Sequence, residues 1–372
     1  MTLKEEKIFL EELELIKGER IDLLESDAIP CVEISDPLIF KHIPLVSVVV
    51  ITYNHERFIR KAIEGIVNQN SSFLIELIIS DDCSADKTLD IIKEYQKKYP
   101  QLIRILYANL NIGIVANALR SDIRTRGKYI AYCEGDDYWI DVGKLQKQVS
   151  IMESDPEIGL IFTGAKEYLL ETNRFISVKT KLLSSEIHPK NYFFKKKLNT
   201  DIFIPTCTVM VRQSNIISAI KNNIVFKINS KMMDSPRWFA ASFNMKTYFL
   251  NDITGVYVIH SDSVSNNWDM KKESRQGCLI LYGFTYAIPT NTINMLVGSK
   301  VFHRIISNAF YHNDKELATV CKNLAKKRNV RLTIISKLKL YAMNLPILRI
   351  FLNYILENSR KIRRVISDLT FN

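Results

Sequence analysis

Residues 128–139 read Lys-Tyr-Ile-Ala-Tyr-Cys-Glu-Gly-Asp-Asp-Tyr-Trp, and the rest of the chain is organised around this stretch. Its apolar run, residues 129–133, predicts a buried strand. The run breaks at Gly135 and is followed by two adjacent carboxylates, Asp136 and Asp137. In an open α/β sheet, ligand-binding groups collect just beyond the carboxyl ends of the strands, so this pair is well placed for chemistry. The alternative is a solvated turn in which Asp137 caps the following helix.

Strands and helices alternate on both sides of this stretch. Residues 46–52, Val-Ser-Val-Val-Val-Ile-Thr, form a β-branched run that is typical of a strand buried on both faces of a parallel sheet. Further strands are predicted at 75–80, 102–107 and 158–163, with helices ending near 68 and 124 and spanning 85–98 and 144–154. Short connections between alternating strands and helices predict a parallel, right-handed α/β sheet.

The alternation stops after residue 165. Residues 166–200 are irregular, basic and aromatic. Beyond them we predict strands at 206–211, 247–250 and 256–260, and helices at 214–223 and from 232 onward. The flanks differ from this body: residues 3–25 predict an acidic helix, residues 26–44 a proline-containing linker, and residues from about 271 to the end a helical region.

Composition predicts a folded protein of a reducing compartment, which we expect to be the cytoplasm. The 372 residues are 47% hydrophobic and 24% charged, which predicts one large or two medium domains. The six cysteines are scattered without a C-x-x-C pair, which argues against a zinc cluster or a disulfide framework and favours a reducing compartment. The N-terminus lacks the layout of a signal peptide, and no apolar stretch is long enough to predict a membrane span.

The net charge of +11 is concentrated at the C-terminus. Residues 301–372 hold 14 Lys/Arg and 4 Asp/Glu, a net of +10, whereas residues 1–30 hold 4 Lys/Arg and 9 Asp/Glu, a net of −5. Residues 331–366 interleave Leu, Ile and Phe with Lys and Arg. This pattern predicts either a basic amphipathic element on an anionic membrane, at the inner face of the plasma membrane, or a helical bundle with a basic solvated face. No nucleic-acid-binding module accompanies the charge, so we expect no nucleic-acid partner. The acidic and basic ends could pair across subunits in a homo-oligomer.

The loops after the first, second and fourth strands are expected to face one crevice. They carry Thr52-Tyr53-Asn54, Asp81-Asp82 and Asp136-Asp137. Together they offer what a nucleotide needs, namely an acceptor for a base N–H, a flat face for stacking, ribose contacts and oxygen ligands for Mg²⁺ or Mn²⁺. The chain lacks G-x-x-x-x-G-K-[ST] and lacks G-x-G-x-x-G after the first strand, so metal and carboxylates are expected to manage the phosphates.

Five segments together resemble the family 2 (GT-A) glycosyltransferases. They are Val-Ser-Val-Val-Val-Ile-Thr-Tyr-Asn (46–54), Ser-Asp-Asp-Cys-Ser-Ala-Asp-Lys-Thr (80–88), Asn-Ile-Gly (111–113), Cys-Glu-Gly-Asp-Asp-Tyr-Trp (133–139) and Lys-Leu-Gln-Lys-Gln-Val (144–149). The resemblance covers about residues 44–265. It implies a Rossmann-like, mainly parallel sheet flanked by helices, with an N-terminal helix and a helical C-terminal extension outside the family pattern.

The resemblance also implies domains and an activity. Residues 1–43 would be an arm and linker, 44–270 the GT-A domain with a nucleotide-sugar half (44–165) and an acceptor half (166–270), and 271–372 the helical basic region. The implied reaction is inverting transfer of a sugar from a nucleotide-sugar, UDP-linked in preference to dTDP-linked, to a hydroxyl on a glycan or lipid-linked glycan. A bacterial surface polysaccharide would be the product.

Residue roles follow from the matching motif positions. Tyr53 resembles the residue that stacks near the base, with Thr52 and Asn54 lining the same pocket. Asp82 resembles the acid that accepts from the N3–H of uracil or thymine, and Asp81 would support the loop.

The second acidic pair has separate implied roles. Asp136 resembles the acid near the ribose, and Asp137 resembles the ligand of Mn²⁺ or Mg²⁺.

Two further residues are implied downstream. Asp234 resembles the general base that deprotonates the acceptor hydroxyl, although Met233 departs from the acid or glycine usual before it. Its alternative role is a helix N-cap. His260 resembles a histidine that completes the metal or contacts the pyrophosphate, against a structural alternative. The remaining candidates, His55, His188, His303 and His312, are expected to be structural.

Two other functions stay open on the residues alone. A sugar-nucleotidyltransferase would share an α/β nucleotide site, but it usually has a glycine-rich loop with Lys or Arg where this chain has Thr-Tyr-Asn-His. A catalytically idle scaffold would not need Asp82, Asp136, Asp137 and Asp234 together.

Overall fold

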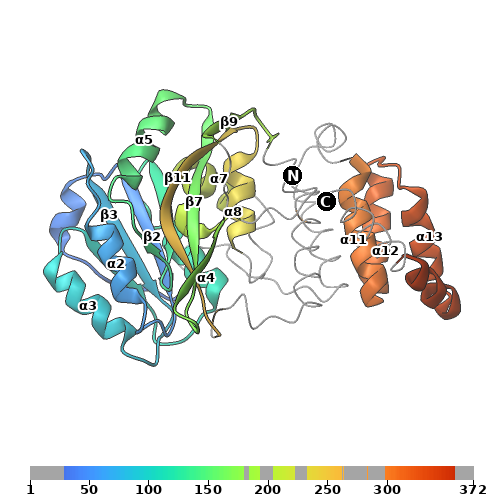
Figure 1. Ribbon diagram of the computed structural model, residues 1–372, viewed down its shortest axis with the longest axis horizontal. Coiled ribbons are helices and arrows are strands. Elements are labelled where there is room, and N and C mark those ends of the chain that lie inside the picture. The colour runs from blue at the N-terminus through green and yellow to red at the C-terminus, as the bar shows by residue number, and fades with distance from the viewer. Residues whose placement is uncertain are drawn as a thin grey trace. The chain divides into compact units, whose positions relative to one another are not determined.

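The computed structural model describes residues 29–179, 184–192, 204–222, 233–261 and 298–356, together with residues 263 and 283. The chain forms two compact units, one of residues 20–268 and one of residues 1–19 with 269–372 (Figure 1). The acidic helix predicted at 3–25 and the chain beyond residue 356 lie outside the described residues.

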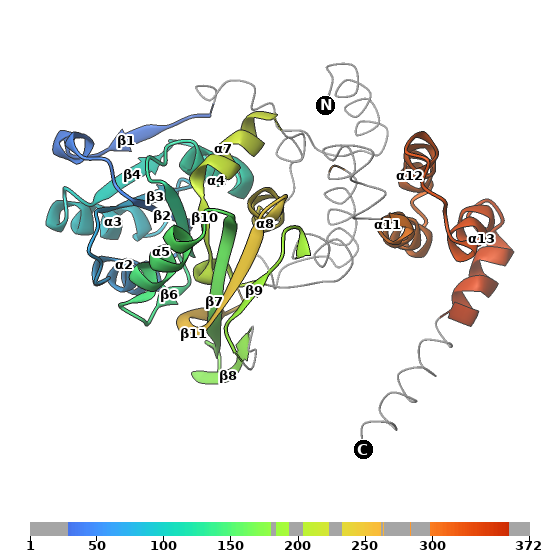
Figure 2. The same cartoon turned by 90° about the horizontal axis from the view of Figure 1, so that it is seen from above.

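A single sheet organises the larger unit, and its described strands run in the order β1-β4-β3-β2-β5-β10-β7-β11-β6 (Figure 2). Two further strands lie off this path, with β8 paired to β7 and β9 paired to β11. The bounds are β1 Val32–Ile34, β2 Val46–Thr52, β3 Ile75–Asp81, β4 Ile103–Tyr107, β5 Tyr129–Glu134, β6 Tyr138–Trp139, β7 Ile158–Leu169, β8 Arg174–Lys179, β9 Glu186–His188, β10 Met210–Arg212 and β11 Lys246–Ile259.

The predicted parallel core is confirmed for four neighbouring strands. β2 pairs in parallel with both β3 and β5, and β3 pairs in parallel with β4. Every residue of β2 is buried, which explains why its sequence is β-branched throughout rather than alternating. The carboxyl ends of β2, β3 and β5 therefore share one edge.

The second half of the sheet differs from the prediction. The strand at 158–163 was expected to extend the parallel set, but β10 lies between β5 and β7 and is antiparallel to both. Residues 206–208, predicted as part of a strand, form a 3-10 turn (η3) instead. The sheet is therefore mixed rather than continuously parallel, because a three-residue strand from late in the chain pairs between two earlier ones.

β11 is one continuous strand, whereas the sequence predicted two short ones at 247–250 and 256–260. It pairs in parallel with β7, and the register shifts between Phe249 and Ile253 and again between Ile253 and Gly255. These irregularities absorb the polar Asn-Asp interruption without ending the strand. β11 is therefore a single strand, and its C-terminal end lies at the site.

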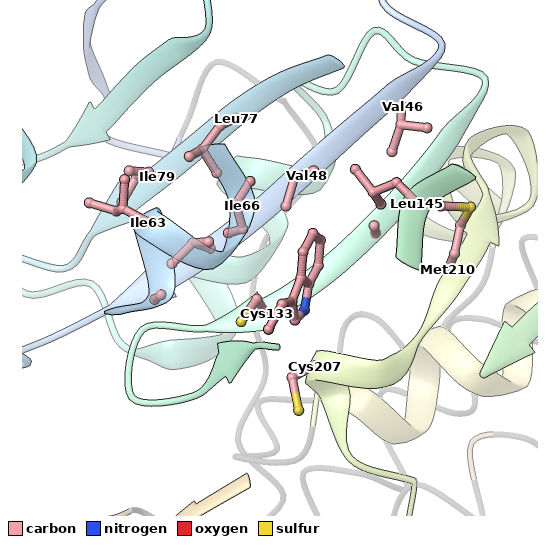
Figure 3. Close-up of a cluster of buried hydrophobic side chains, with 14 of the residues drawn as sticks. Val46, Val48, Ile63, Ile66, Leu77, Ile79, Cys133, Leu145, Cys207 and Met210 are labelled. Carbon is pink, nitrogen blue, oxygen red and sulfur yellow. The ribbon is translucent and has the colours of Figure 1, made fainter. Parts of the chain in front are cut away.

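Helices cover both faces of the sheet. One face packs on α2 (Ile59–Val67), α3 (Thr88–Lys98) and α5 (Lys144–Ser154), and the cluster drawn in Figure 3 includes Val46, Val48, Ile63 and Leu145. The other face packs on α4 (Ile114–Asp122), α7 (Gln213–Asn222) and α8 (Asp234–Ser242). The three layers confirm the predicted α/β class with flanking helices.

Two segments expected to be irregular contain regular structure. Within the predicted linker 26–44, β1 pairs with β4, and residues Pro37–Lys41 form the 3-10 helix η2. Within 166–200, β7 continues to Leu169 and forms a hairpin with β8, and β9 pairs with β11.

The described part of the smaller unit consists of α11 (Gly298–His312), α12 (Lys315–Lys327), α13 (Ile334–Ala342) and a further helical stretch at 346–356. Buried side chains such as Phe302, Ile306 and Leu324 form its core, and α11 packs on both α12 and α13. Whether residues 331–366 contact a membrane stays a prediction. None of the helices in the described ranges is both long enough and apolar enough to cross a bilayer.

Candidate functional site

The three loops predicted to share a crevice meet at the carboxyl edge of β2, β3 and β5. The Asp82 N–H donates to the Thr52 carbonyl at 3.0 Å, and the Gly135 N–H donates to the Ile51 carbonyl at 3.0 Å. These backbone bonds continue the sheet past the strand ends and hold Thr52, Asp82 and the 135–137 segment beside one another.

In the loop after β2, Tyr53 is exposed whereas Asn54 forms hydrogen bonds with the neighbouring loop. Tyr53 leaves 46% of its surface exposed, so its ring is available for stacking. Asn54 has a positive φ of 55° and its side-chain oxygen accepts from the Ala85 N–H at 2.8 Å. The Asn54 N–H in turn donates to Ser84 Oγ at 2.9 Å. The Asn54 side chain therefore joins the loops after β2 and β3, a contact that the sequence did not reveal.

The Asn-Ile-Gly turn wraps the carboxylate of Asp82. The N–H groups of Ile112 and Gly113 donate to its two oxygens at 2.8 and 3.0 Å. Burial raises the pKa of Asp82, and the two backbone hydrogen bonds oppose this shift without cancelling it. Asp81 accepts from the Ser84 N–H at 3.0 Å, in keeping with a supporting role.

Arg120, which was not among the residues predicted from the sequence, holds the end of β3 in place through hydrogen bonds. It is fully buried and donates to Ser80 Oγ at 3.0 Å, to the Asp81 carbonyl at 2.8 Å and to Asn117 Oδ1 at 2.7 Å. A guanidinium can satisfy several acceptors from one rigid plane. It therefore sets the direction in which Asp81 and Asp82 leave the sheet.

Asp137 lies at the centre of the site and is only 2% exposed. Its Oδ1 accepts from the Val258 N–H at 2.9 Å, whereas its Oδ2 is buried and has no hydrogen-bond partner among the described residues. Burial, followed by the charge of Asp136, raises the pKa of Asp137 well above its ordinary value. Burying a carboxylate oxygen without a partner costs free energy unless a cation or a proton neutralises the charge.

The carboxylate of Asp137 fits a divalent cation that takes most of its ligands from water and substrate phosphates. Within the described ranges, no group of three or more His, Cys, Asp or Glu side chains is arranged to hold a metal. Mg²⁺ in proteins keeps several waters and is often bound by one or two carboxylates together with substrate phosphates. The single orphaned oxygen of Asp137 meets that requirement.

Two histidines and a phenylalanine surround Asp136. His260 Nε2 lies 3.1 Å from Asp136 Oδ2, and the His260 ring stacks on Phe58 with centroids 4.7 Å apart. His55 Nε2 lies 3.9 Å from the same oxygen. Burial raises the pKa of Asp136, but the hydrogen bond with His260 and the proximity of His55 outweigh it, so the pKa is lower than usual. His260 thus contacts Asp136, while His55, expected to be structural, belongs to the site.

Gly135 is required by close packing at this point. A Cβ at this position would lie 2.6 Å from Thr52 Oγ1 and 2.7 Å from His55 Nδ1. Both atoms are buried without a hydrogen-bond partner in the described structure. Glycine therefore lets the chain turn directly against the end of β2 just before Asp136 and Asp137.

Asp234 is the first residue of α8, and its Oδ1 accepts from the Ser235 N–H at 2.7 Å. The N-cap position is held by Met233 instead. Burial, followed by the charges of Asp136 and Asp234, raises the pKa of Glu134 at the end of β5 to about 8. The role of Asp234 as a general base stays a prediction.

A buried ion pair anchors α8. Arg237 donates to Asp122 at the end of α4 at 2.9 and 3.0 Å, and its guanidinium lies 4.4 Å from the centre of the Tyr132 ring on β5. Sequence reasoning missed this pair, because nothing in the spacing of residues 122 and 237 links them.

Comparisons with known proteins agree with the geometry. Residues 47–216 match the family described as Glycosyl transferase family 2. An uncharacterized protein of Mycobacterium tuberculosis is 39% identical over 166 residues, covering 42% of this chain and 48% of that protein. The Escherichia coli UDP-Glc:alpha-D-GlcNAc-diphosphoundecaprenol beta-1,3-glucosyltransferase WfaP is 27% identical over 286 residues, covering 77% of this chain and 99% of that protein.

The fold is also that of a solved structure. Staphylococcus aureus TarS residues 1–349, in complex with UDP-GlcNAc, superposes with a TM-score of 0.58 at 15% identity and covers 84% of this chain and 92% of that one. The chain spans about half the length of the mycobacterial relative. Residues 47–216 are therefore similar to the family 2 glycosyltransferases, and the chain has the GT-A fold that the motifs predicted.

Proposed function

We propose that this protein transfers a sugar from a UDP-sugar to a hydroxyl of a lipid-linked glycan, with inversion at the anomeric carbon. The observation that carries the proposal is Asp137, whose Oδ2 is buried without a partner at the edge shared by Asp82 and Asp136. Two similar proteins support the choice of substrates. WfaP is named for UDP-Glc and a diphosphoundecaprenol-linked sugar, and the TarS structure contains UDP-GlcNAc.

Donor binding is assigned to groups at the strand ends. The exposed ring of Tyr53 stacks on the base, Thr52 and Asn54 shape that pocket, and Asp82 accepts from the N3–H with lone pairs left free by the 111–113 turn. Asp136, held by His260, binds the ribose. Asp137 Oδ2 would hold Mn²⁺ or Mg²⁺, which when bound screens the diphosphate charge and helps UDP to leave. A metal role for His260 itself stays a prediction.

The acceptor side is assigned to α8. Asp234 takes the proton from the acceptor hydroxyl as its oxygen attacks the anomeric carbon, and the bond between that carbon and the diphosphate breaks. Attack from the face opposite the leaving group inverts the centre in one displacement. The Arg237–Asp122 pair ties α8, which begins at Asp234, to the end of α4.

The test is a transfer assay with the purified full chain, a panel of UDP-sugars, Mn²⁺ and a synthetic prenyl-diphosphate-linked sugar as acceptor. We expect one donor to be used and the new linkage, determined by NMR, to have the inverted configuration. Asp234→Asn should lower kcat without changing donor affinity, and Asp252→Asn, an exposed acid bound to Lys147, serves as the matched control. Wild-type turnover in Asp234→Asn would remove that residue from the mechanism.

Two results would replace the proposal. Release of pyrophosphate from a nucleoside triphosphate and a sugar phosphate would identify a nucleotidyltransferase. No turnover and no binding of UDP with metal would identify an idle scaffold. Assembly of a homo-oligomer stays a prediction, because the acidic N-terminal segment lies outside the described residues.

A further inference from the structure

The helix α13 buries polar side chains and exposes apolar ones, which is the reverse of the usual amphipathic pattern. Its buried side chains are Ser336, Lys339 and Ala342, whereas Ile334 is 78% and Tyr341 63% exposed. Helices of globular proteins normally turn their apolar stripe toward the core. An exposed large apolar patch is the informative departure from that rule.

Specific contacts impose this orientation on α13. Ser336 Oγ lies 2.9 Å from His303 Nδ1, and Lys339 Nζ donates to Ser307 Oγ at 2.8 Å. The Lys339 ammonium also lies 5.0 Å from the centre of the Tyr311 ring. Rotating α13 to bury its apolar side would break these contacts with α11, so they hold the apolar side outward.

The exposed apolar surface continues beyond α13. In the helical stretch 346–356, Ile347 is 85%, Phe351 60% and Tyr354 66% exposed. We call the exposed apolar residues of α13 and 346–356 the apolar face. Soluble monomers rarely leave so many large apolar side chains together in water. Such a face is typical of a surface that binds a partner.

Cations adjoin the apolar face. An open groove of about 580 Å³ between α12 and α13 is lined by Lys322, Lys326, Arg331 and Lys337 over a floor that includes Val330 and Leu340. None of the four cations forms an ion pair with a carboxylate in the part of the chain that the structure describes. We call this feature the basic groove.

The local sequence has no counter-charge. Residues 317–356 contain eight Lys/Arg and no Asp or Glu. A partner for this surface must therefore be anionic and must also accept apolar side chains.

We propose that the basic groove and the apolar face together dock the helical unit on an anionic lipid bilayer. Lipid phosphates bind the cations of the basic groove, and the apolar face enters the boundary between headgroups and acyl chains. A nucleic acid would satisfy the cations but leave Ile347 and Phe351 in water. A second copy on the same face would bring like charges together. A bilayer of anionic lipid satisfies both features at once.

The experiment is vesicle flotation of the full chain. We expect flotation with phosphatidylcholine vesicles that contain phosphatidylglycerol, little with phosphatidylcholine alone, and weakening as salt is raised. Each Lys or Arg near such a surface contributes about fivefold in binding, so the double variant Lys326→Gln/Lys337→Gln should bind about 25-fold more weakly. Lys315→Gln, which removes one exposed lysine of α12 outside the basic groove, is a single-charge control.

A second pair of variants tests the apolar face. Ile347→Ser should also weaken flotation, while Ile43→Ser should not, because Ile43 is similarly exposed at 81% but lies in the other unit. Both serines replace exposed side chains, so folding is preserved and circular dichroism confirms it.

Several outcomes would overturn the proposal. These are equal flotation with neutral vesicles, no flotation at all, or unchanged binding in both test variants. A dimer in sedimentation experiments without lipid that dissociates in Ile347→Ser would assign the surface to a second copy. Equal competition by duplex DNA would assign the charge to polyanions in general. None of these measurements depends on sugar transfer, so this proposal and the enzymatic one fail separately.

Discussion

The ion pair between Arg237 and Asp122 makes a quantitative prediction. The two side chains are 2% and 0% exposed and share two short hydrogen bonds, so neither has water to replace its partner. Arg237→Met leaves the Asp122 carboxylate buried and uncompensated, which costs about 3–5 kcal/mol. At about 2–4 °C per kcal/mol for a unit of this size, the melting temperature should fall by about 6–20 °C.

The stability lost in Arg237→Met should depend on pH. Burial already raises the pKa of Asp122, and Arg237 opposes that shift. Without Arg237 the pKa rises further, so the folded variant binds a proton more tightly than the unfolded chain does. Its stability therefore falls as pH rises, and the deficit should be smaller near pH 5 than near pH 8.

Thermal unfolding followed by circular dichroism at both pH values measures these quantities. The double variant Arg237→Met/Asp122→Leu is the control, because replacing both partners of a buried pair by apolar residues is often neutral. A melting temperature of Arg237→Met equal to that of the wild type would refute the reasoning. So would a double variant as unstable as the single one.

Three further predictions concern the site and its support. Gly135→Ala should reduce sugar transfer about a hundredfold with the fold retained, because its Cβ would lie 2.6 Å from Thr52 Oγ1 and displace the acids; unchanged turnover would contradict the packing argument. Tyr53→Ala should raise the donor KM about tenfold without lowering the melting temperature, and an unaltered KM would exclude stacking. Burial lowers the pKa of Lys144 to about 7 from an ordinary 10.5, so the unfolded chain binds more protons across that window and stability should rise with pH. Lys144→Met should remove that rise, while the exposed Lys147, changed to Met, should preserve it.

The sequence predicted the parallel core well for a physical reason. Strands buried on both faces must be apolar at every position, and β2 shows this directly. The acids that follow such strands must lie at one edge, so the proximity of Thr52, Asp82 and Asp137 could be inferred before any coordinates.

The features that were not predicted from the sequence depend on contacts between segments far apart in the chain. β10 has only three paired residues, and nothing in them indicates insertion between β5 and β7. β11 was divided into two because polar residues at a bulge resemble a loop. His55 was set aside as structural, although its position directly after Thr-Tyr-Asn was the available signal. Arg237 and Asp122 are 115 residues apart, beyond any local pattern.

The sharpest test of the proposed donor site is nucleotide release from a panel of UDP-sugars, with and without Mn²⁺. We expect that one UDP-sugar is hydrolysed slowly, that chelation stops the reaction and added metal restores it, and that Asp137→Ala cannot be restored. Asp252→Ala, which removes an exposed acid, should behave as the wild type does. Metal-dependent release by Asp137→Ala at the wild-type rate would contradict the role of the orphaned oxygen on which the proposal depends.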